Sequence, residues 1–370
     1  MLKKKQKPVT IITGYLGAGK TTVINELLRS KKSDGMGIII NDMGSVNIDA
    51  SLIKNSDLFQ KNTTMVELTN GCICCTLKDE FMKQINDIAA YKNVDRILVE
   101  ASGISDPSAI AAGFLQYEQM GYCERIYLDS IVCVVDADRV YREFIDDLIQ
   151  EHGNDKNNDP DIINLVVDQI EFSNVILLNK CDMLSVEEKK KVRDAVRVLQ
   201  KSADIVECIH GKVNPDRIFK STKFDYEKAM SSSRIQEQLL KGTEEIKDEH
   251  GIVSFLYEER RPFNYDKFMK YLEKDYPEGI IRAKGFMWFN DDDIHVQLFE
   301  QVGRNASVTI VSNWLAAFSE EERIAEIKDY PESMDGWDEK YGDRINQIVF
   351  IGKNINSNKI YEQLDKCLDE

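Results

Sequence analysis

The fold is decided near the start of the chain by Val9-Thr10-Ile11-Ile12-Thr13-Gly14-Tyr15-Leu16-Gly17-Ala18-Gly19-Lys20-Thr21. Residues 9–13 are apolar and β-prone, and residues 20–30 have helical periodicity. The Gly-x-x-x-x-Gly-Lys-Thr segment between them therefore has the strand–loop–helix context of a P-loop. Its glycines let backbone N–H groups wrap phosphates, Lys20 brings a charge to the β- and γ-phosphates, and the Thr21 hydroxyl is placed to bind Mg²⁺. The stretch predicts a nucleoside triphosphate site.

Outward from this loop, short apolar runs alternate with helical patterns. The expected strands are residues 9–13, 37–40, 96–99, 130–135 and 174–178. The expected helices are residues 20–30, 77–91, 107–119, 138–150 and 186–202. Buried parallel strands are nearly continuous in apolar residues and are joined by helices, so the pattern predicts an α/β domain with a mainly parallel sheet.

The pattern changes beyond residue 220. Residues 221–250 are charged and Ser-rich, as in a linker with one helix. After it, strands expected at 252–257, 280–289, 294–301, 307–312 and 347–351 follow one another with helices only at 265–274 and 359–368. We predict a P-loop domain over 1–220, a linker over 221–250 and a smaller α+β C-terminal domain over 251–370. We also expect Phe286, Trp288, Phe289 and Trp314 in its core, and Arg282 and Lys284 at an exposed sheet edge.

The base of the nucleotide is indicated by Asn179-Lys180-Cys181-Asp182, directly after an expected strand. An Asp carboxylate there can accept hydrogen bonds from both N1–H and the 2-amino group of guanine, which adenine cannot supply. A wrong base would leave the acceptor unpaired, so such a site discriminates strongly. The motif predicts GTP rather than ATP.

Glu100-Ala101-Ser102-Gly103 follows another expected strand, where an acid and a glycine that respond to the γ-phosphate should lie. We expect Glu100 to orient Mg²⁺-bound water and the Gly103 N–H to contact the γ-phosphate. Residues 41–49 are the expected first switch segment, with Asp49, and less favourably Asp42, positioning the attacking water or Mg²⁺. Because no arginine finger is apparent near these motifs, intrinsic hydrolysis should be slow without a partner or metal.

A second kind of site is indicated by three cysteines within four residues, Cys72, Cys74 and Cys75. Three thiolates suit Zn²⁺, Cu(I) and related ions. No second Cys or His pair with metal-ligand spacing occurs elsewhere, so the site would be open and able to exchange its metal. This favours a carried ion over a structural one. The alternative is a set of buried or redox-active thiols that bind no metal.

The composition and net charge of the chain indicate which classes of partner it can bind. The chain has 370 residues, a hydrophobic fraction of 42% and a net charge of −16, as in an acidic globular protein. That charge repels nucleic acid and anionic lipid, and no apolar run approaches the ~18 residues of a membrane span. We expect a cytoplasmic protein that binds neither nucleic acid nor membrane. In a reducing compartment its eight cysteines are poor evidence for disulfides.

With these motifs in place, the chain resembles the CobW-type metallochaperone GTPases, relatives of the hydrogenase and urease nickel-insertion GTPases. The resemblance is carried by residues 14–22, 69–75, 100–103 and 179–182, and by 261–263, 282–288, 341–344 and 349–352 in the C-terminal part. It implies a SIMIBI-class GTPase that uses GTP and Mg²⁺. It also implies a metal on the cysteines, most often Zn²⁺ and in some members Co²⁺.

The resemblance completes the predicted site. The nucleotide-binding residues are Gly14, Gly17, Ala18, Gly19, Lys20, Thr21, Thr22, Gly103, Asn179, Lys180 and Asp182. The catalytic residues are Lys20, Asp49 and Glu100, with Thr21 and Glu100 at Mg²⁺ and Cys72, Cys74 and Cys75 at the transition metal. Two features depart from many relatives. Asp42 and Ser45 stand where those relatives have Glu, and the four histidines form no cluster.

The expected function is a GTP-hydrolysing metallochaperone that transfers its metal to a client protein recognised by the C-terminal domain. One alternative is a GTPase that activates a specific metallo- or corrinoid enzyme. Another is a metal buffer or sensor whose hydrolysis is incidental. A homo-oligomer is one of the states left open.

Overall fold

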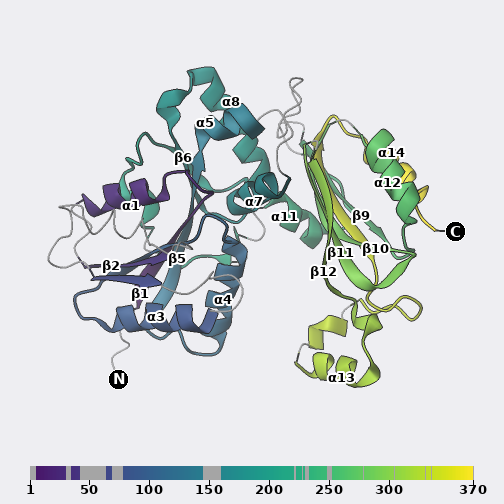
Figure 1. Ribbon diagram of the computed structural model, residues 1–370, viewed down its shortest axis with the longest axis horizontal. Coiled ribbons are helices and arrows are strands. Elements are labelled where there is room, and N and C mark those ends of the chain that lie inside the picture. Colours follow the sequence, from purple (N-terminus) through teal and green to yellow (C-terminus); the bar gives the residue numbers. More distant parts are fainter. Residues whose placement is uncertain are drawn as a thin grey trace. The chain divides into compact units, whose positions relative to one another are not determined.

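The computed structural model describes residues 6–30, 35–41, 64–68, 78–144, 160–220, 222–226, 228–229, 233–247, 252–277, 279–303, 305–329, 331–334 and 336–369. The chain divides into two compact units (Figure 1). The first comprises Met1–Phe144 and Leu165–Ser233, and the second comprises Ile145–Asn164 and Arg234–Glu370. The domain limits expected from the sequence stay a prediction.

A seven-stranded sheet with the order β3-β2-β4-β1-β5-β6-β7 forms the centre of the first unit, and all its strand pairs are parallel. The strands are β1 (Lys7–Thr13), β2 (Met36–Asn41), β3 (Thr64–Leu68), β4 (Arg96–Glu100), β5 (Ile126–Asp136), β6 (Val175–Asn179) and β7 (Asp204–Glu207). Because β1 lies between β4 and β5, the loop after β1 emerges among the carboxyl ends of its neighbours. This is the position in which open α/β sheets bind ligands.

Helices cover both faces of this sheet. They are α1 (Lys20–Leu28), α3 (Lys78–Ala90), α4 (Pro107–Gln119), α5 (Ala137–Arg139), α7 (Pro160–Glu171), α8 (Val186–Leu199) and α9 (Pro215–Ile218). Figure 1 shows α1 on one face and α3 with α4 on the other. Alternation along β1 explains this arrangement. Ile11 belongs to the core cluster under α3 and α4, whereas Ile12 belongs to the cluster under α1.

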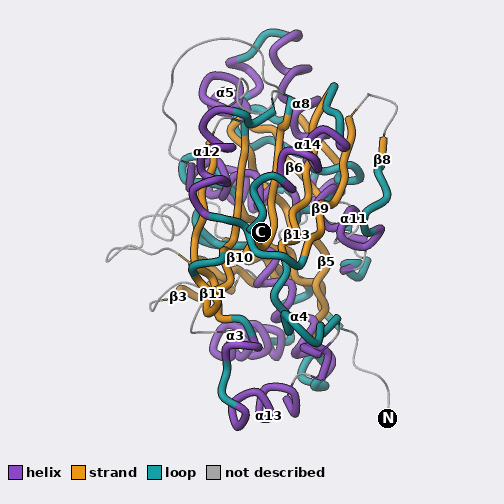
Figure 2. Tube along the Cα trace, turned by 90° about the vertical axis from the view of Figure 1, so that its right-hand side faces the viewer, coloured by secondary structure: helices purple, strands orange, loops and turns teal. Residues whose placement is uncertain are grey.

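The second unit contains a six-stranded antiparallel sheet with the order β12-β11-β10-β13-β9-β8. Its strands are β8 (Ile246–Lys247), β9 (Ile252–Glu259), β10 (Ile280–Phe289), β11 (Asp292–Val302), β12 (Asn305–Asn313) and β13 (Asn346–Lys353). Its helices are α11 (Arg234–Lys241), α12 (Tyr265–Lys274), α13 (Glu320–Asp329) and α14 (Ser357–Asp365). Figure 2 shows α12 and α14 in front of the sheet. Phe268 of α12 and Leu364 of α14 belong to the aromatic core of this unit. The predicted fold class is confirmed.

Several local expectations change. The structure adds β3, β7, α7, α9 and α13, which were not expected. The helix expected at 138–150 begins as the short α5 followed by a π-helical turn, Val140–Phe144. The placement of Arg282 and Lys284 at an exposed sheet edge was wrong. β10 is an interior strand and the Arg282 side chain is fully buried, donating a hydrogen bond of 3.0 Å to Asn164 Oδ1. Phe286, expected in the core, is exposed, because it lies on the sheet face opposite the aromatic cluster.

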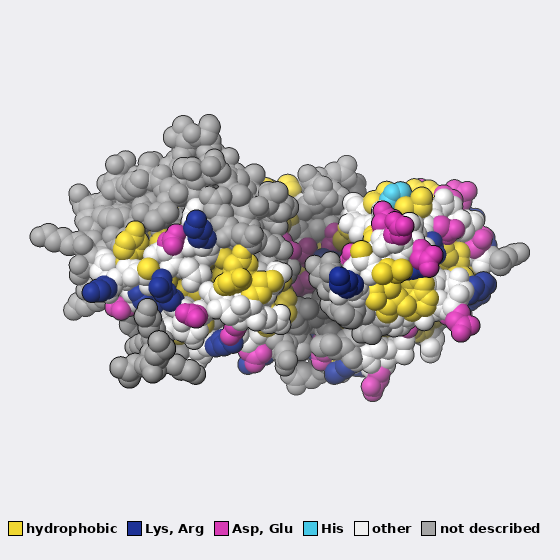
Figure 3. Space-filling model, turned by 90° about the horizontal axis from the view of Figure 1, so that it is seen from below, with side chains coloured by type: hydrophobic (Ala, Val, Ile, Leu, Met, Phe, Trp, Pro, Cys, Tyr) yellow, Lys and Arg dark blue, Asp and Glu magenta, His cyan; other side chains and the backbone are white. Residues whose placement is uncertain are grey.

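In the described part of the chain, none of the helices has the length and apolar character needed to cross a lipid bilayer. Figure 3 shows one face of the molecule, on which Lys and Arg side chains are interspersed with Asp and Glu.

Candidate nucleotide-binding site

The P-loop connects β1 to α1 in a conformation that depends on glycine. Gly14 and Gly19 have φ angles of 135° and 102°, which side chains of L-residues rarely adopt. A Cβ at Gly14 would lie 2.2 Å from the Val134 carbonyl oxygen, and one at Gly19 would lie 2.4 Å from Asn179 Nδ2. The loop is therefore held tightly against β5 and β6.

The start of α1 suits a phosphate group. Its N-cap residue is Gly19, which makes no side-chain hydrogen bond to the first turn, and a helix N-terminus of this kind can bind an anion. Lys20 follows at once, and its Nζ donates a hydrogen bond of 2.8 Å to the Gly14 carbonyl across the loop. The cradle of backbone N–H groups and the ammonium group together fit a polyphosphate.

Two predicted Mg²⁺ ligands meet beside this loop. The Thr21 hydroxyl donates a hydrogen bond of 3.1 Å to Glu100 Oε1, although the two residues are 79 positions apart. The register explains the contact, since Ile12 pairs with Glu100 at the end of β4. A hydroxyl and a nearly buried carboxylate form a hard oxygen donor set of the kind Mg²⁺ takes. Asp49 and Asp42 lie outside the described residues.

The loop after β4 packs directly on the P-loop. A Cβ at Gly103 would lie 2.7 Å from Leu16 Cδ2 and 3.0 Å from the Leu16 backbone nitrogen. Glycine at this position therefore permits a close approach between the two loops. The expected γ-phosphate contact, Gly103, and the P-loop thus lie side by side.

The guanine motif is attached to the same loop by Asn179. This buried side chain donates to the Ala18 carbonyl at 2.9 Å and accepts from the Gly211 N–H at 3.0 Å. Lys180 has a left-handed backbone and its Nζ lies 2.5 Å from Asp136 Oδ2, while Asp182 is exposed in a short 3-10 turn, Cys181–Met183. The structure therefore brings the described members of the predicted nucleotide site to one edge of the sheet.

Sequence reasoning missed three contributors. The first is the loop after β7, where Gly211 has a φ of 71° and a Cβ would lie 2.8 Å from the Val23 backbone nitrogen. The second is Arg139, whose guanidinium carbon lies 4.8 Å from the centroid of the Tyr15 ring in the P-loop. The third is Gln169 of α7, which contacts the loop after β4. Apolar residues at 163, 166, 167 and 170 carry the helical spacing that would have revealed α7.

The predicted transition-metal ligands, Cys72, Cys74 and Cys75, lie outside the described residues. The described cysteines, Cys123, Cys133, Cys181, Cys208 and Cys367, are all buried. Burial raises the pKa of Cys133 and Cys208 to about 12, so these thiols stay protonated at neutral pH. Within the described ranges, no group of three or more His, Cys, Asp or Glu side chains could hold a metal ion.

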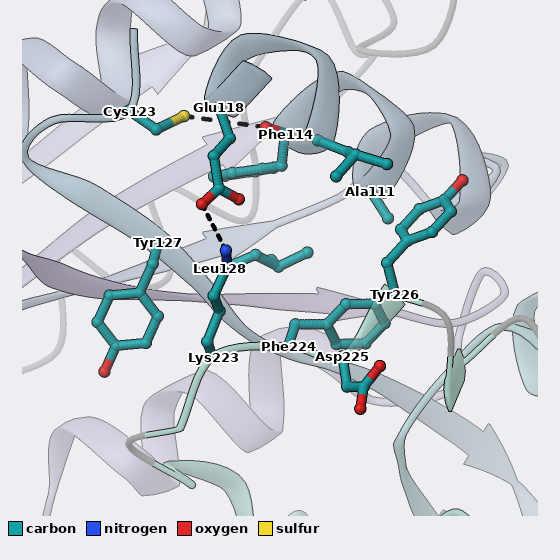
Figure 4. Close-up of a pocket in the computed structure, with 11 residues that line it drawn as sticks. Ala111, Phe114, Glu118, Cys123, Tyr127, Leu128, Lys223, Phe224, Asp225 and Tyr226 are labelled. Carbon is teal, nitrogen blue, oxygen red and sulfur yellow. Dashed lines mark hydrogen bonds and ion pairs between the residues drawn. The ribbon is translucent and has the colours of Figure 1, made fainter. Parts of the chain in front are cut away.

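A separate pocket of about 360 Å³ lies between α4, the first half of β5 and residues 223–226 (Figure 4). Phe114, Leu128 and Phe224 line it, and an ion pair between Glu118 and Lys223 crosses its rim. None of the predicted nucleotide-site residues contributes to its wall. The predicted nucleotide motifs lie at the opposite ends of the strands, away from this pocket.

Comparison with known families decides the assignment. Residues 8–207 match the family model CobW/HypB/UreG, nucleotide-binding domain, and residues 252–368 match the cobalamin synthesis protein cobW C-terminal domain. This chain belongs to the CobW/HypB/UreG family. The predicted family is thus confirmed.

Similar relatives span most of the chain. The zinc-regulated GTPase metalloprotein activator 1 of Dictyostelium discoideum is 32% identical over 98% of this chain and 79% of its own length. The zinc chaperone YjiA of Escherichia coli is 25% identical over 80% of this chain and 86% of its own length. The zinc chaperone CobW of a Sinorhizobium species is 32% identical, over 56% of this chain and 60% of its own length.

Proposed function

We propose that this chain is a GTP-hydrolysing metallochaperone that transfers a transition metal ion to a client protein. Zinc is the favoured ion, and Cys72, Cys74 and Cys75 are its proposed ligands. The observation that carries the nucleotide half is Asn179, whose amide joins the guanine motif to the P-loop through Ala18. The metal half is supported by the cysteine spacing and by the names of the zinc chaperone relatives. Its place of action is the cytoplasm.

The enzyme class is the firm part of this function. The family assignment and the GTPase relative confirm the predicted GTPase, with GTP and Mg²⁺ as the nucleotide and its cation. Lys20 and the α1 N-terminus would hold the β- and γ-phosphates, and Asp182 would read guanine. Thr21 and Glu100 would hold Mg²⁺, which neutralises the charge developing on the phosphates. The role of Asp49 stays a prediction.

The metal half can be tested by counting thiols. Of eight cysteines, the five described ones are buried, and Cys123 and Cys367 have pKa values raised by burial to about 11. We therefore expect a thiol reagent at pH 7 to modify up to three cysteines of the native metal-free chain, and Zn²⁺ to protect those three. Mass spectrometry of the modified peptides checks which ones react. Protection by Zn²⁺ at other cysteines, or at none, would refute the assignment.

Coupling between the two sites needs a separate measurement. If GTP favours the metal-holding state and GDP the releasing state, Zn²⁺ affinity must differ between a GTP analogue and GDP. We expect at least about a fivefold difference, within the usual range of coupling between sites. The double variant Cys74→Ser, Cys75→Ser should lose the zinc without losing nucleotide binding. Equal Zn²⁺ affinities in the two nucleotide states would contradict the delivery cycle.

A second candidate is a GTPase that activates one metalloprotein without delivering metal. The name of the Dictyostelium relative, a metalloprotein activator, favours it. A client already loaded with zinc distinguishes the two functions. If this chain is a chaperone, the activity of the zinc-loaded client stays unchanged. If this chain is an activator, that activity rises in the presence of GTP.

A further inference from the structure

Gln169 is a buried polar residue with no part in the nucleotide-binding motifs. Its side chain is 1% exposed and projects from α7. Its Nε2 donates two hydrogen bonds, 3.1 Å to the Gly103 carbonyl and 3.2 Å to the Ser105 carbonyl. Both amide hydrogens are thereby used on one loop more than 60 residues earlier in sequence.

That loop is held from both sides. On one side Gly103 approaches the P-loop so closely that a Cβ would collide with Leu16. On the other side Gln169 fixes the carbonyls of residues 103 and 105. Within the loop, the Ser105 N–H donates to the Ser102 carbonyl at 3.0 Å, which closes a tight turn. Two fixed carbonyls restrict the rotation of the intervening peptide groups, so the orientation of the whole turn depends on Gln169.

Gln169 is itself well anchored. The Ser173 hydroxyl donates to the Gln169 carbonyl at 2.7 Å, and the neighbouring α7 residues Val166, Val167 and Ile170 are buried. Gln169 and Val166 also line a small recess with Tyr15 and Leu16 of the P-loop. A rigid donor on a packed helix suits the task of fixing a loop, because little side-chain freedom remains to be lost.

We propose that Gln169 is a positioning residue for the γ-phosphate: it keeps the Gly103 turn against the P-loop and so makes the preference for GTP over GDP depend on α7. This inference rests on the proposed GTPase site, in which the Gly103 N–H contacts the γ-phosphate. GDP lacks that phosphate. Loss of the Gln169 hydrogen bonds should therefore weaken GTP binding selectively, whereas general damage to the fold would weaken both nucleotides.

The test uses Gln169→Met in the full chain, which keeps the side-chain length and removes both donors. Affinities for GDP and for a non-hydrolysable GTP analogue are measured at constant Mg²⁺, together with kcat and KM for GTP. We expect the ratio of the two dissociation constants, analogue over GDP, to rise about tenfold, as for the loss of one to two buried hydrogen bonds. KM for GTP should rise and kcat should fall.

Gln238→Met is the matched control. Gln238 is equally buried but belongs to the second unit, and its Nε2 likewise donates two hydrogen bonds, 2.8 Å to the Gly242 carbonyl and 2.7 Å to the Glu244 carbonyl. It should lower thermal stability and leave the ratio unchanged. The shorter Gln169→Asn serves if Gln169→Met does not fold, with the same expected direction.

An unchanged ratio in a folded Gln169 variant, or an equal rise in Gln238→Met, overturns the positioning role. A wild-type chain that binds neither nucleotide would instead overturn the proposed function, so the two failures are distinguishable.

Discussion

At the scale of single residues, the contacts of Asn179 with neighbouring loops show why the side chain at this position is constrained. Asn179 satisfies its amide nitrogen on Ala18 and its amide oxygen on Gly211, and it lies against Gly19. One residue therefore connects the P-loop, the guanine motif and the loop after β7. Since it is buried, any substitution that removes one of these bonds leaves the partner group unsatisfied.

Asp182 allows a prediction about base specificity. Asp182→Asn replaces an acceptor-only carboxylate with an amide, so the pair of hydrogen bonds to guanine N1–H and the 2-amino group is lost. We expect GTP affinity to fall about 100-fold or more, and xanthine nucleotides, which carry an oxygen at position 2, to bind relatively better. Fluorescent nucleotide titrations measure both.

The control for this change is Asp194→Asn, which makes the same charge change at an exposed position of α8. It should leave both affinities unaltered. If Asp182→Asn binds GTP as tightly as the wild type, Asp182 does not read the base.

At the scale of elements, ion pairs connect β7 to α9 and to the residues that follow this helix. Asp204 in β7 pairs with Arg217 of α9 and with Lys220, which is 2.8 Å away. The hydrogen bond from Arg217 is the main cause that lowers the pKa of Asp204 to about 2, from an ordinary value of 3.8. The folded state therefore holds this carboxylate in its charged form, which links the edge of the sheet to the helix after it.

The sign of the pH dependence follows from that shift. A carboxylate with a lowered folded pKa stabilises the fold fully above about 3.8 and loses this contribution as the pH falls towards about 2. We expect Asp204→Asn to lower the free energy of unfolding by about 1 kcal/mol at pH 7, because the pair is partly exposed and screened. Urea denaturation at several pH values should show the difference between the two proteins shrinking below pH 4. A difference that grows on acidification would contradict this account.

Some helices and strands were predicted correctly from the sequence, whereas others were missed. The strands expected at 96–99 and 174–178 are present because parallel buried strands are continuous in apolar residues. α7 was missed although its apolar residues have helical spacing, because an Ile- and Val-rich run also fits a buried strand. The short β3 and β7 lie at the two edges of the sheet and carry weaker patterns.

At the scale of the whole molecule, each unit has its own core. Ile11 and Ile12 contribute to the two clusters of the first unit, whereas Phe255 and Phe350 stack at 5.3 Å in the second. We therefore expect deletion of residues 251–370 to leave GTP binding within about threefold of the full chain and to abolish metal transfer to the client. Nucleotide titration and a zinc-transfer assay measure the two effects.

The full-length Lys20→Ala variant tests the opposite case to the deletion, because it changes the predicted GTP site and leaves the second unit intact. It keeps the second unit but should lose GTP hydrolysis, since the charge at the β- and γ-phosphates is removed. Transfer that persists after the deletion would show that the second unit does not recognise the client. Transfer that persists in Lys20→Ala would favour a metal buffer over a chaperone.

Local spacing in the sequence was enough to predict the family, the parallel sheet and the nucleotide motifs. The signals were a P-loop between a strand and a helix, and polar residues directly after apolar strands. Tertiary structure alone decided which distant groups meet. It placed Thr21 on Glu100, Asn179 on Ala18 and Gln169 on the Gly103 turn. No local pattern encodes such pairs, because they follow from strand order and helix packing, which are properties of the folded chain.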